Sequence, residues 1–173
     1  MWKDNPATAM YQDPDQESVR QDLTLLFGPR SDYYLKEYEA IRQRKVAGEA
    51  LRPSWNWSVF FGAFVWFFYR KLYVYGAALV IVPIVLTRLL GDSPLGFSAG
   101  VMLCVLANYV YVDWALWHVA KANTLNLQGE ERVAYLRRVG GVSKWAGGIS
   151  GVLFGLIALI VLVGVFFKHR RHI

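Results

Sequence analysis

Three polar residues lie close together in a stretch that is otherwise largely apolar: Asn108, Tyr111 and Asp113. An ionisable side chain at membrane depth is costly unless it has a partner, and such residues often mark proton or ion paths. The cluster therefore has two interpretations. It is either a proton or cation relay, or the site of an ion pair between Asp113 and Arg70 or Lys71. One carboxylate without a second acid makes a weak transport site, which favours the ion pair.

A stripe of small residues is the second feature with a physical consequence. Gly147, Gly151 and Gly155 follow one another at intervals of four residues in a long apolar run. On a helix this spacing places them on one face, where small residues let two backbones approach closely within a membrane. We expect a helix-packing seam within the chain. The alternative is a seam with a second copy or a partner helix.

Other residue types that could do chemistry are poorly placed for it. His169 and His172 have no nearby carboxylate and make a poor metal site. The single cysteine, Cys104, excludes an internal disulfide and a cysteine-based zinc or iron–sulfur site. No nucleophile–base arrangement and no phosphate-cradling glycine loop stands out. The sequence therefore predicts no catalytic residue, no metal and no cofactor, and a protein that is not an enzyme.

Residues 55–75 hold 11 of the 27 aromatic residues of the chain. The chain is polar before this stretch and mostly apolar after it. A helix over residues 57–68 would be about 18 Å long, short of a hydrocarbon core of about 30 Å. Tryptophan and tyrosine at its ends are typical of the headgroup boundary. We therefore expect an interfacial or re-entrant helix, anchored by aromatic and basic side chains at Trp55, Trp57, Trp66, Tyr69, Arg70 and Lys71.

Composition also favours a membrane protein. Hydrophobic residues make up 55% of the chain and charged residues only 18%, whereas a soluble domain carries about a quarter. The net charge of +6 could suggest nucleic-acid binding. The basic residues, however, cluster beside apolar segments, as they do in membrane topology signals. We expect membrane lipids as partners, with Arg70 and Lys71 either binding anionic headgroups or fixing topology, and no nucleic acid.

The fold class predicted is an all-α integral membrane protein. Two short N-terminal helices, from Asp15 to Phe27 and from Ser31 or Asp32 to about Lys45, follow a flexible tail that ends at Met10. They are too short to bury a core alone, so we expect them to dock on the membrane domain or on a partner. Punctuating residues predict a stop of the first helix at Gly28–Pro29, a break at Arg52–Pro53 and a tight turn at Gly91–Pro94. A further short helix is expected over 130–139, ended by two glycines. The predicted parts are a polar cytosolic segment (1–53), the aromatic helix (54–71), a transmembrane domain (72–167, with spans at about 72–90, 95–117 and 146–167) and a basic tail (168–173).

The distribution of Lys and Arg orients these spans. Three spans with a cytoplasmic N-terminus put 15 basic residues inside and 4 outside. If the aromatic stretch also crossed the membrane, the distribution would be 12 inside and 7 outside. We therefore predict three spans, with four as the alternative; the number of spans decides on which side the C-terminus lies.

Several local motifs resemble one protein family. They are Phe27-Gly28, the DYYLKEY segment at 32–38, WNWSVFF at 55–61, WFFYRKLY at 66–73, and an Asn-x-x-Tyr pattern at 108–111. Together they resemble a bacterial inner-membrane family known only as a domain of unknown function, over roughly residues 25–112. The chain departs from the pattern at Trp55 and Val59, where Phe and Ala are usual, and lacks a Pro near position 63. The resemblance implies a bacterial cytoplasmic membrane and carries no catalytic role.

Together these features predict a small polytopic inner-membrane protein that acts through protein–protein or protein–lipid interaction. It could be an accessory subunit, an assembly factor or an immunity-type factor, with a membrane-protein partner or a second copy of itself. The alternative is a small transporter or channel subunit that uses Asn108, Tyr111 and Asp113. A membrane-embedded enzyme ranks third, because no paired titratable groups stand out.

Overall fold

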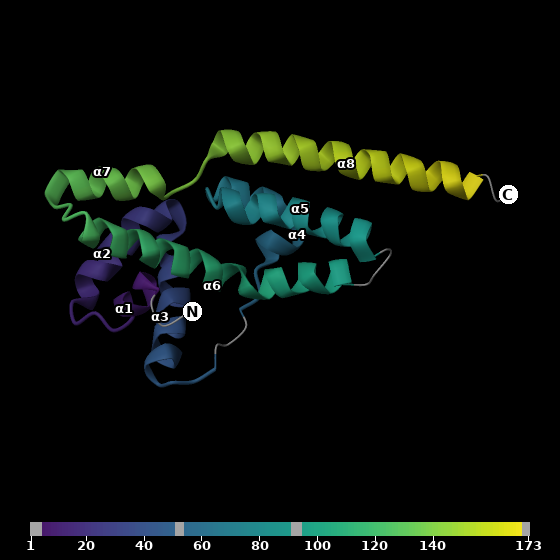
Figure 1. Ribbon diagram of the computed structural model, residues 1–173. Helices are drawn as coiled ribbons and strands as arrows, with labels where there is room; N and C mark the ends of the chain where they lie inside the picture. Colours follow the sequence, from purple (N-terminus) through teal and green to yellow (C-terminus); the bar gives the residue numbers. More distant parts are fainter. Residues whose placement is uncertain (1–4, 51–53, 91–94, 171–173) are drawn as a thin grey trace.

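The computed structural model describes residues 5–50, 54–90 and 95–170 (Figure 1). Within these residues every regular element is a helix, which confirms the all-α prediction. The predicted break at Arg52–Pro53, the turn at Gly91–Pro94 and the last three tail residues lie outside the described residues. The elements are α1 (Pro6–Met10), α2 (Gln16–Phe27), the 3-10 turn η1 (Gly28–Arg30), α3 (Ser31–Val46), α4 (Trp57–Tyr69), α5 (Tyr73–Leu90), α6 (Leu95–Thr124), α7 (Gly129–Val139) and α8 (Lys144–Arg170).

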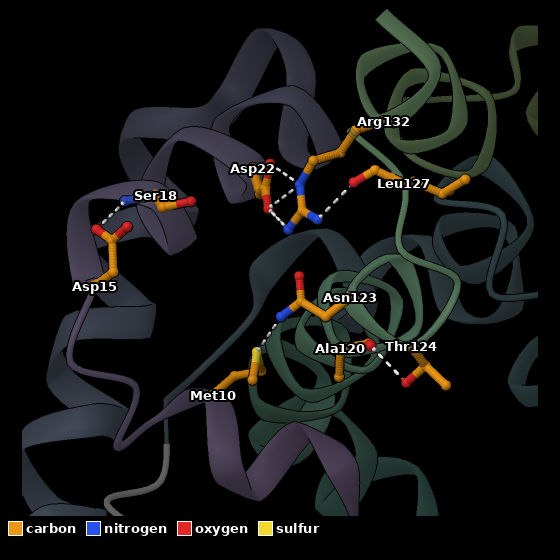
Figure 2. A network of polar contacts seen from close by, with 9 residues as sticks. All are labelled: Met10, Asp15, Ser18, Asp22, Ala120, Asn123, Thr124, Leu127 and Arg132. Carbon is orange, nitrogen blue, oxygen red and sulfur yellow. Dashed lines mark hydrogen bonds and ion pairs between the residues drawn. The ribbon is translucent and has the colours of Figure 1, made fainter. Parts of the chain in front are cut away.

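Local signals define the ends of α2. The Asp15 carboxylate accepts a hydrogen bond of 3.1 Å from the backbone N–H of Ser18, a standard N-cap (Figure 2). The helix ends at Gly28, whose φ of +64° is open to glycine at little cost. Pro29 follows, so the helix cannot continue.

The predicted flexible tail before Met10 is wrong for the residues that are described there. Asn5 accepts a hydrogen bond of 3.0 Å from Ala7 N–H, and Pro6 occupies the first helical position of α1. Ala7 and Tyr11 are fully buried, because α1 packs against α6. A helix of five residues is too short for hydrophobic periodicity to indicate it.

We use the term head for α1–α3, α7 and residues 112–124 of α6, which pack together. Helix α6 continues past the predicted span end at residue 117 to Thr124, and the N-terminal helices dock on this extension. Helix α7 is held to α2 by Arg132, whose Nε donates to both Asp22 carboxylate oxygens at 3.0 and 3.1 Å (Figure 2). The same guanidinium donates to the Leu127 carbonyl at 3.4 Å.

We use the term apolar arm for α4, α5, α8 and residues 95–111 of α6. In Figure 1, α5 and α8 leave the head in the same direction and α6 returns to it. Helix α4 runs antiparallel to the beginning of α8. Tyr69 lies against Gly147, and farther along, the Phe64 and Phe154 ring centroids are 5.9 Å apart. The head and the arm therefore meet where α4 ends and α8 begins.

Among the described residues, one apolar helical stretch, which runs to Gly164 within α8, is long enough and apolar enough to cross a membrane. A shorter apolar stretch covers Tyr73–Val82 in α5. Crossing by α5 and by the first part of α6, and hence a total of three spans, stays a prediction.

Candidate functional site

The joint between head and arm is built around Arg70, the residue that follows α4. Its side chain is only 3% exposed. One terminal nitrogen, Nη1, donates to the Phe27 carbonyl at 3.2 Å and to the Tyr111 hydroxyl at 3.3 Å. Arg70 thus connects the C-terminal ends of α2 and α4 to the middle of α6.

Aromatic rings surround the guanidinium. Its central carbon lies 4.7 Å from the Tyr34 ring centroid and 5.2 Å from that of Tyr111. These distances fit cation–π interactions, which are strongest when the cation is withdrawn from water. Burial raises the pKa of Tyr34, and the Arg70 charge opposes that shift.

No carboxylate pairs with Arg70 in the part of the chain that the structure describes. Its Nε is buried and has no hydrogen-bond partner within the described ranges. A buried cation normally requires a paired or fully hydrogen-bonded environment. Arg70 is therefore incompletely compensated by the chain itself.

Lys71 binds the end of a helix. Its backbone adopts a φ of +62°, and its Nζ donates to the carbonyls of Arg138 at 2.9 Å and Gly140 at 2.6 Å. A cation is favourable there because the C-terminus of α7 carries the negative end of the helix dipole. Burial lowers the pKa of Lys71. Arg70 and Lys71, which the sequence predicts as basic anchors at the membrane surface, thus both have their side chains bound to groups of the protein.

The structure gives separate partners to the three polar residues predicted as one cluster. Tyr111 binds Arg70. Asp113 accepts a hydrogen bond of 3.0 Å from Asn5 and has Lys45 Nζ at 3.7 Å. The ion-pair partner of Asp113 is thus Lys45 of α3, and neither of the basic residues expected from the sequence.

Asn108 belongs to a third group. Its side-chain oxygen accepts a hydrogen bond of 2.8 Å from Asn56, and its nitrogen donates to Ser54 Oγ and Tyr33 OH, each at 2.9 Å. Asn56 also caps α4, because its oxygen accepts from Val59 N–H at 3.1 Å. The sequence reasoning missed Asn56, although an asparagine just before an apolar run is a recognisable N-cap signal.

The glycine stripe is divided between two environments. A Cβ on Gly147 would lie 2.8 Å from the Tyr69 ring, so this glycine is required by packing within the chain. A Cβ on Gly151 would only reach Val65 at 4.0 Å. Gly155 has no neighbour within 4 Å among the described atoms. The glycine stripe therefore packs within the chain at Gly147, whereas at Gly155 no described part of the chain covers it.

The predicted aromatic anchors also differ from one another. Trp55, Trp57 and Tyr69 are exposed, as expected of side chains at a surface. Trp66 is buried, and its ring centroid lies 5.7 Å from that of Tyr111. Trp66 therefore packs beside the Arg70 site.

In the described ranges no three His, Cys, Asp or Glu side chains come together in a way that could hold a metal. His172 lies outside these ranges. No family model matches this chain, and no curated protein or solved structure does either. The resemblance to a bacterial inner-membrane family stays a prediction, and function is argued from the geometry alone.

Proposed function

We propose that this chain is a small multi-pass protein of the bacterial cytoplasmic membrane that acts by binding other molecules. The observation that supports this most strongly is the outer surface of α8. Large apolar side chains project from it with high exposure, for example Ile149 at 69% and Ile160 at 70%. Leaving such surface in water costs roughly 25 cal/mol per Å², so it requires lipid or a protein partner.

In this proposal the head lies in the cytoplasm and the arm lies in the membrane. Helices α5, α6 and α8 would cross, and α4 would be a re-entrant or interfacial helix. Its 13 residues span about 20 Å, which is too short to cross alone. Exposed tyrosine and tryptophan at Tyr73 and Trp145 would mark the headgroup level on the cytoplasmic side.

Binding, and not chemistry, is proposed because each of the three polar residues predicted as a site holds helices together. Asn108, Tyr111 and Asp113 each bind a different partner from the head or the arm. Such connections suit an accessory subunit, an assembly factor or an immunity-type factor. The partners would be membrane lipids together with a membrane protein or a second copy of the chain.

Native mass spectrometry of the protein extracted from its own membrane tests this proposal. We expect a second protein in fixed ratio, a homo-oligomer or retained lipids. A bare monomer would contradict it. Ion flux in liposomes that Asp113→Asn abolishes, with protein abundance unchanged, would favour the transporter alternative.

A further inference from the structure

A cavity of about 480 Å³ opens where η1, α4 and the start of α8 come together. Three of the residues that line it are cationic: Arg30, Arg70 and Lys144. Among the residues that the structure describes, no aspartate or glutamate lines it. The concentration of positive charge around an acid-free cavity indicates an anionic ligand.

Arg70 supplies the buried part of this cavity. It is 97% withdrawn from solvent, and among the described residues its Nε has no hydrogen-bond partner, while its Nη1 donates to a carbonyl and a hydroxyl. A phosphate in the cavity would supply the negative charge that Arg70 lacks nearby, since a guanidinium binds phosphate through charge-assisted and often bidentate hydrogen bonds.

Arg30 and Lys144 supply the rim. Both are exposed, and neither pairs with a carboxylate among the described residues. Lys144 is also the first residue of α8, so the positive end of that helix dipole points to the same place. Gly148 also lines the cavity, and a Cβ added to it would have no described neighbour within 4 Å.

The position of the cavity indicates that its anionic ligand is a component of the membrane. The backbone N–H of Ser143, just before α8, donates to the Tyr69 carbonyl at 2.8 Å, which holds the start of α8 at the level of Arg70. The exposed rings of Tyr69, Tyr73 and Trp145 lie next to this bond in the chain, as in an aromatic belt at the headgroup level. Gly62 and Val65 extend the lining along α4, which belongs to the apolar arm.

We infer that this cavity binds the phosphate of an anionic membrane phospholipid. Arg70 holds the phosphate at the floor, Arg30 and Lys144 hold it at the rim, and the acyl chains continue over the apolar surface of α8. The inference rests on the proposed function, because it requires the arm to lie in lipid.

The test is native mass spectrometry of the full chain in detergent, titrated with phosphatidylglycerol or with phosphatidylcholine of the same acyl chains. The variant Arg30→Gln/Lys144→Gln removes two exposed cations and should fold. The control Lys36→Gln/Arg137→Gln removes two exposed cations that do not line the cavity. We expect the wild type and the control to prefer phosphatidylglycerol. The cavity variant should lose about thirtyfold in affinity for it, as two basic residues at an anionic surface would give.

Equal binding of the two lipids, or equal losses in the cavity and control variants, would overturn the inference. A parallel titration with inorganic phosphate separates lipid from soluble phosphate. Displacement of the lipid by millimolar phosphate would assign the cavity to a soluble anion and also overturn it. A protein that stays embedded in the membrane without any headgroup preference would contradict this inference alone and leave the proposed function intact.

Discussion

The side-chain amides of Asn56 and Asn108 are joined by a hydrogen bond of 2.8 Å, and both residues are buried. This bond fixes the beginning of α4 to the middle of α6. The Asn108 oxygen accepts this bond, and its side-chain nitrogen donates to Ser54 and Tyr33. The head, the arm and the segment between them are thus all bound to one amide. Buried polar networks of this kind stabilise one arrangement of helices when every member is satisfied.

Replacing Asn108 should therefore destabilise the protein. Asn108→Leu keeps the side-chain size but leaves the Asn56 amide without its acceptor, which costs about 1–3 kcal/mol. Thermal unfolding in detergent measures the change. Asn123→Leu is the control, because Asn123 lies exposed on the same helix and its side-chain nitrogen donates to the Met10 sulfur at 3.7 Å, a weak hydrogen bond (Figure 2). Equal melting temperatures for the two variants would exclude a structural role for the amide bond.

Although Arg70 is buried, it should contribute little to the free energy of unfolding. Arg70→Met removes the desolvation cost of a buried charge without a carboxylate partner, but it also removes the hydrogen bonds to the Phe27 carbonyl and the Tyr111 hydroxyl. These effects oppose each other, so the variant should lie within about 1 kcal/mol of the wild type. Arg70→Lys keeps the charge and loses the guanidinium fork, so it should be the less stable variant by about 2 kcal/mol. Chemical unfolding of both variants in the same detergent checks the order. The reverse order would show that Arg70 is present for folding and not for a ligand.

The Asp22–Arg132 pair should stabilise the head strongly. Their side chains are 8% and 19% exposed, and breaking a pair so buried by Asp22→Ala costs about 2–4 kcal/mol. The Arg20–Glu39 pair is the control, with side chains 43% and 29% exposed, and its disruption should cost under about 1 kcal/mol. Double-mutant cycles on the two pairs measure both couplings. Similar coupling energies would contradict the burial argument.

Stability should fall on mild acidification because of His118. Burial, with the nearby Lys121 charge, lowers its pKa from about 6.5 to about 4, and its Nδ1 lies 2.8 Å from the Tyr135 hydroxyl of α7. Between these two values the unfolded chain binds the proton more readily than the folded protein, so stability decreases as pH falls from 6.5 towards 4.

His118→Gln should remove this part of the pH dependence. The measurement is the melting temperature of the wild type and the variant at pH 7.5 and at pH 5. Other titrating groups contribute equally to both proteins, so the difference between the two pH dependences reports on His118. A drop of the same size in the variant would assign the acid sensitivity to other residues.

The two ends of the glycine stripe should respond differently to substitution. Gly147→Leu drives a side chain into the Tyr69 ring and should cost about 1–3 kcal/mol. Gly155→Leu enters open space and should leave the unfolding of the monomer unchanged. If Gly155→Leu instead lowers the mass of the particle in detergent, the open end of the stripe is a seam between chains.

The sequence predicts best the features that local rules determine. The predicted start of a helix at Asp15 and the stop at Gly28–Pro29 rest on local signals, so the position of α2 follows from a few neighbouring residues. The helix expected over 130–139 corresponds to α7, which acidic residues begin and glycine ends.

Tertiary contacts are harder to predict. Nothing near Asp113 in the sequence indicates Lys45 as its partner, and nothing near Arg70 indicates Tyr34. Trp66 has the residue type of an interfacial anchor, but its direction depends on how α4 packs against α6. The cavity lined by Arg30 and Lys144 arises only when η1 and α8 are brought together.

The most direct test of the central claim is the depth of α8 in lipid. In a Cys104→Ala background, single spin labels at Leu156 on α8 and at Glu130 on α7 are compared in lipid nanodiscs. Both positions are exposed. If α8 lies in the membrane, lipid-soluble oxygen relaxes the Leu156 label and a water-soluble nickel complex relaxes the Glu130 label. Relaxation of the Leu156 label by the water-soluble complex would contradict the claim, because α8 would then lie outside the membrane.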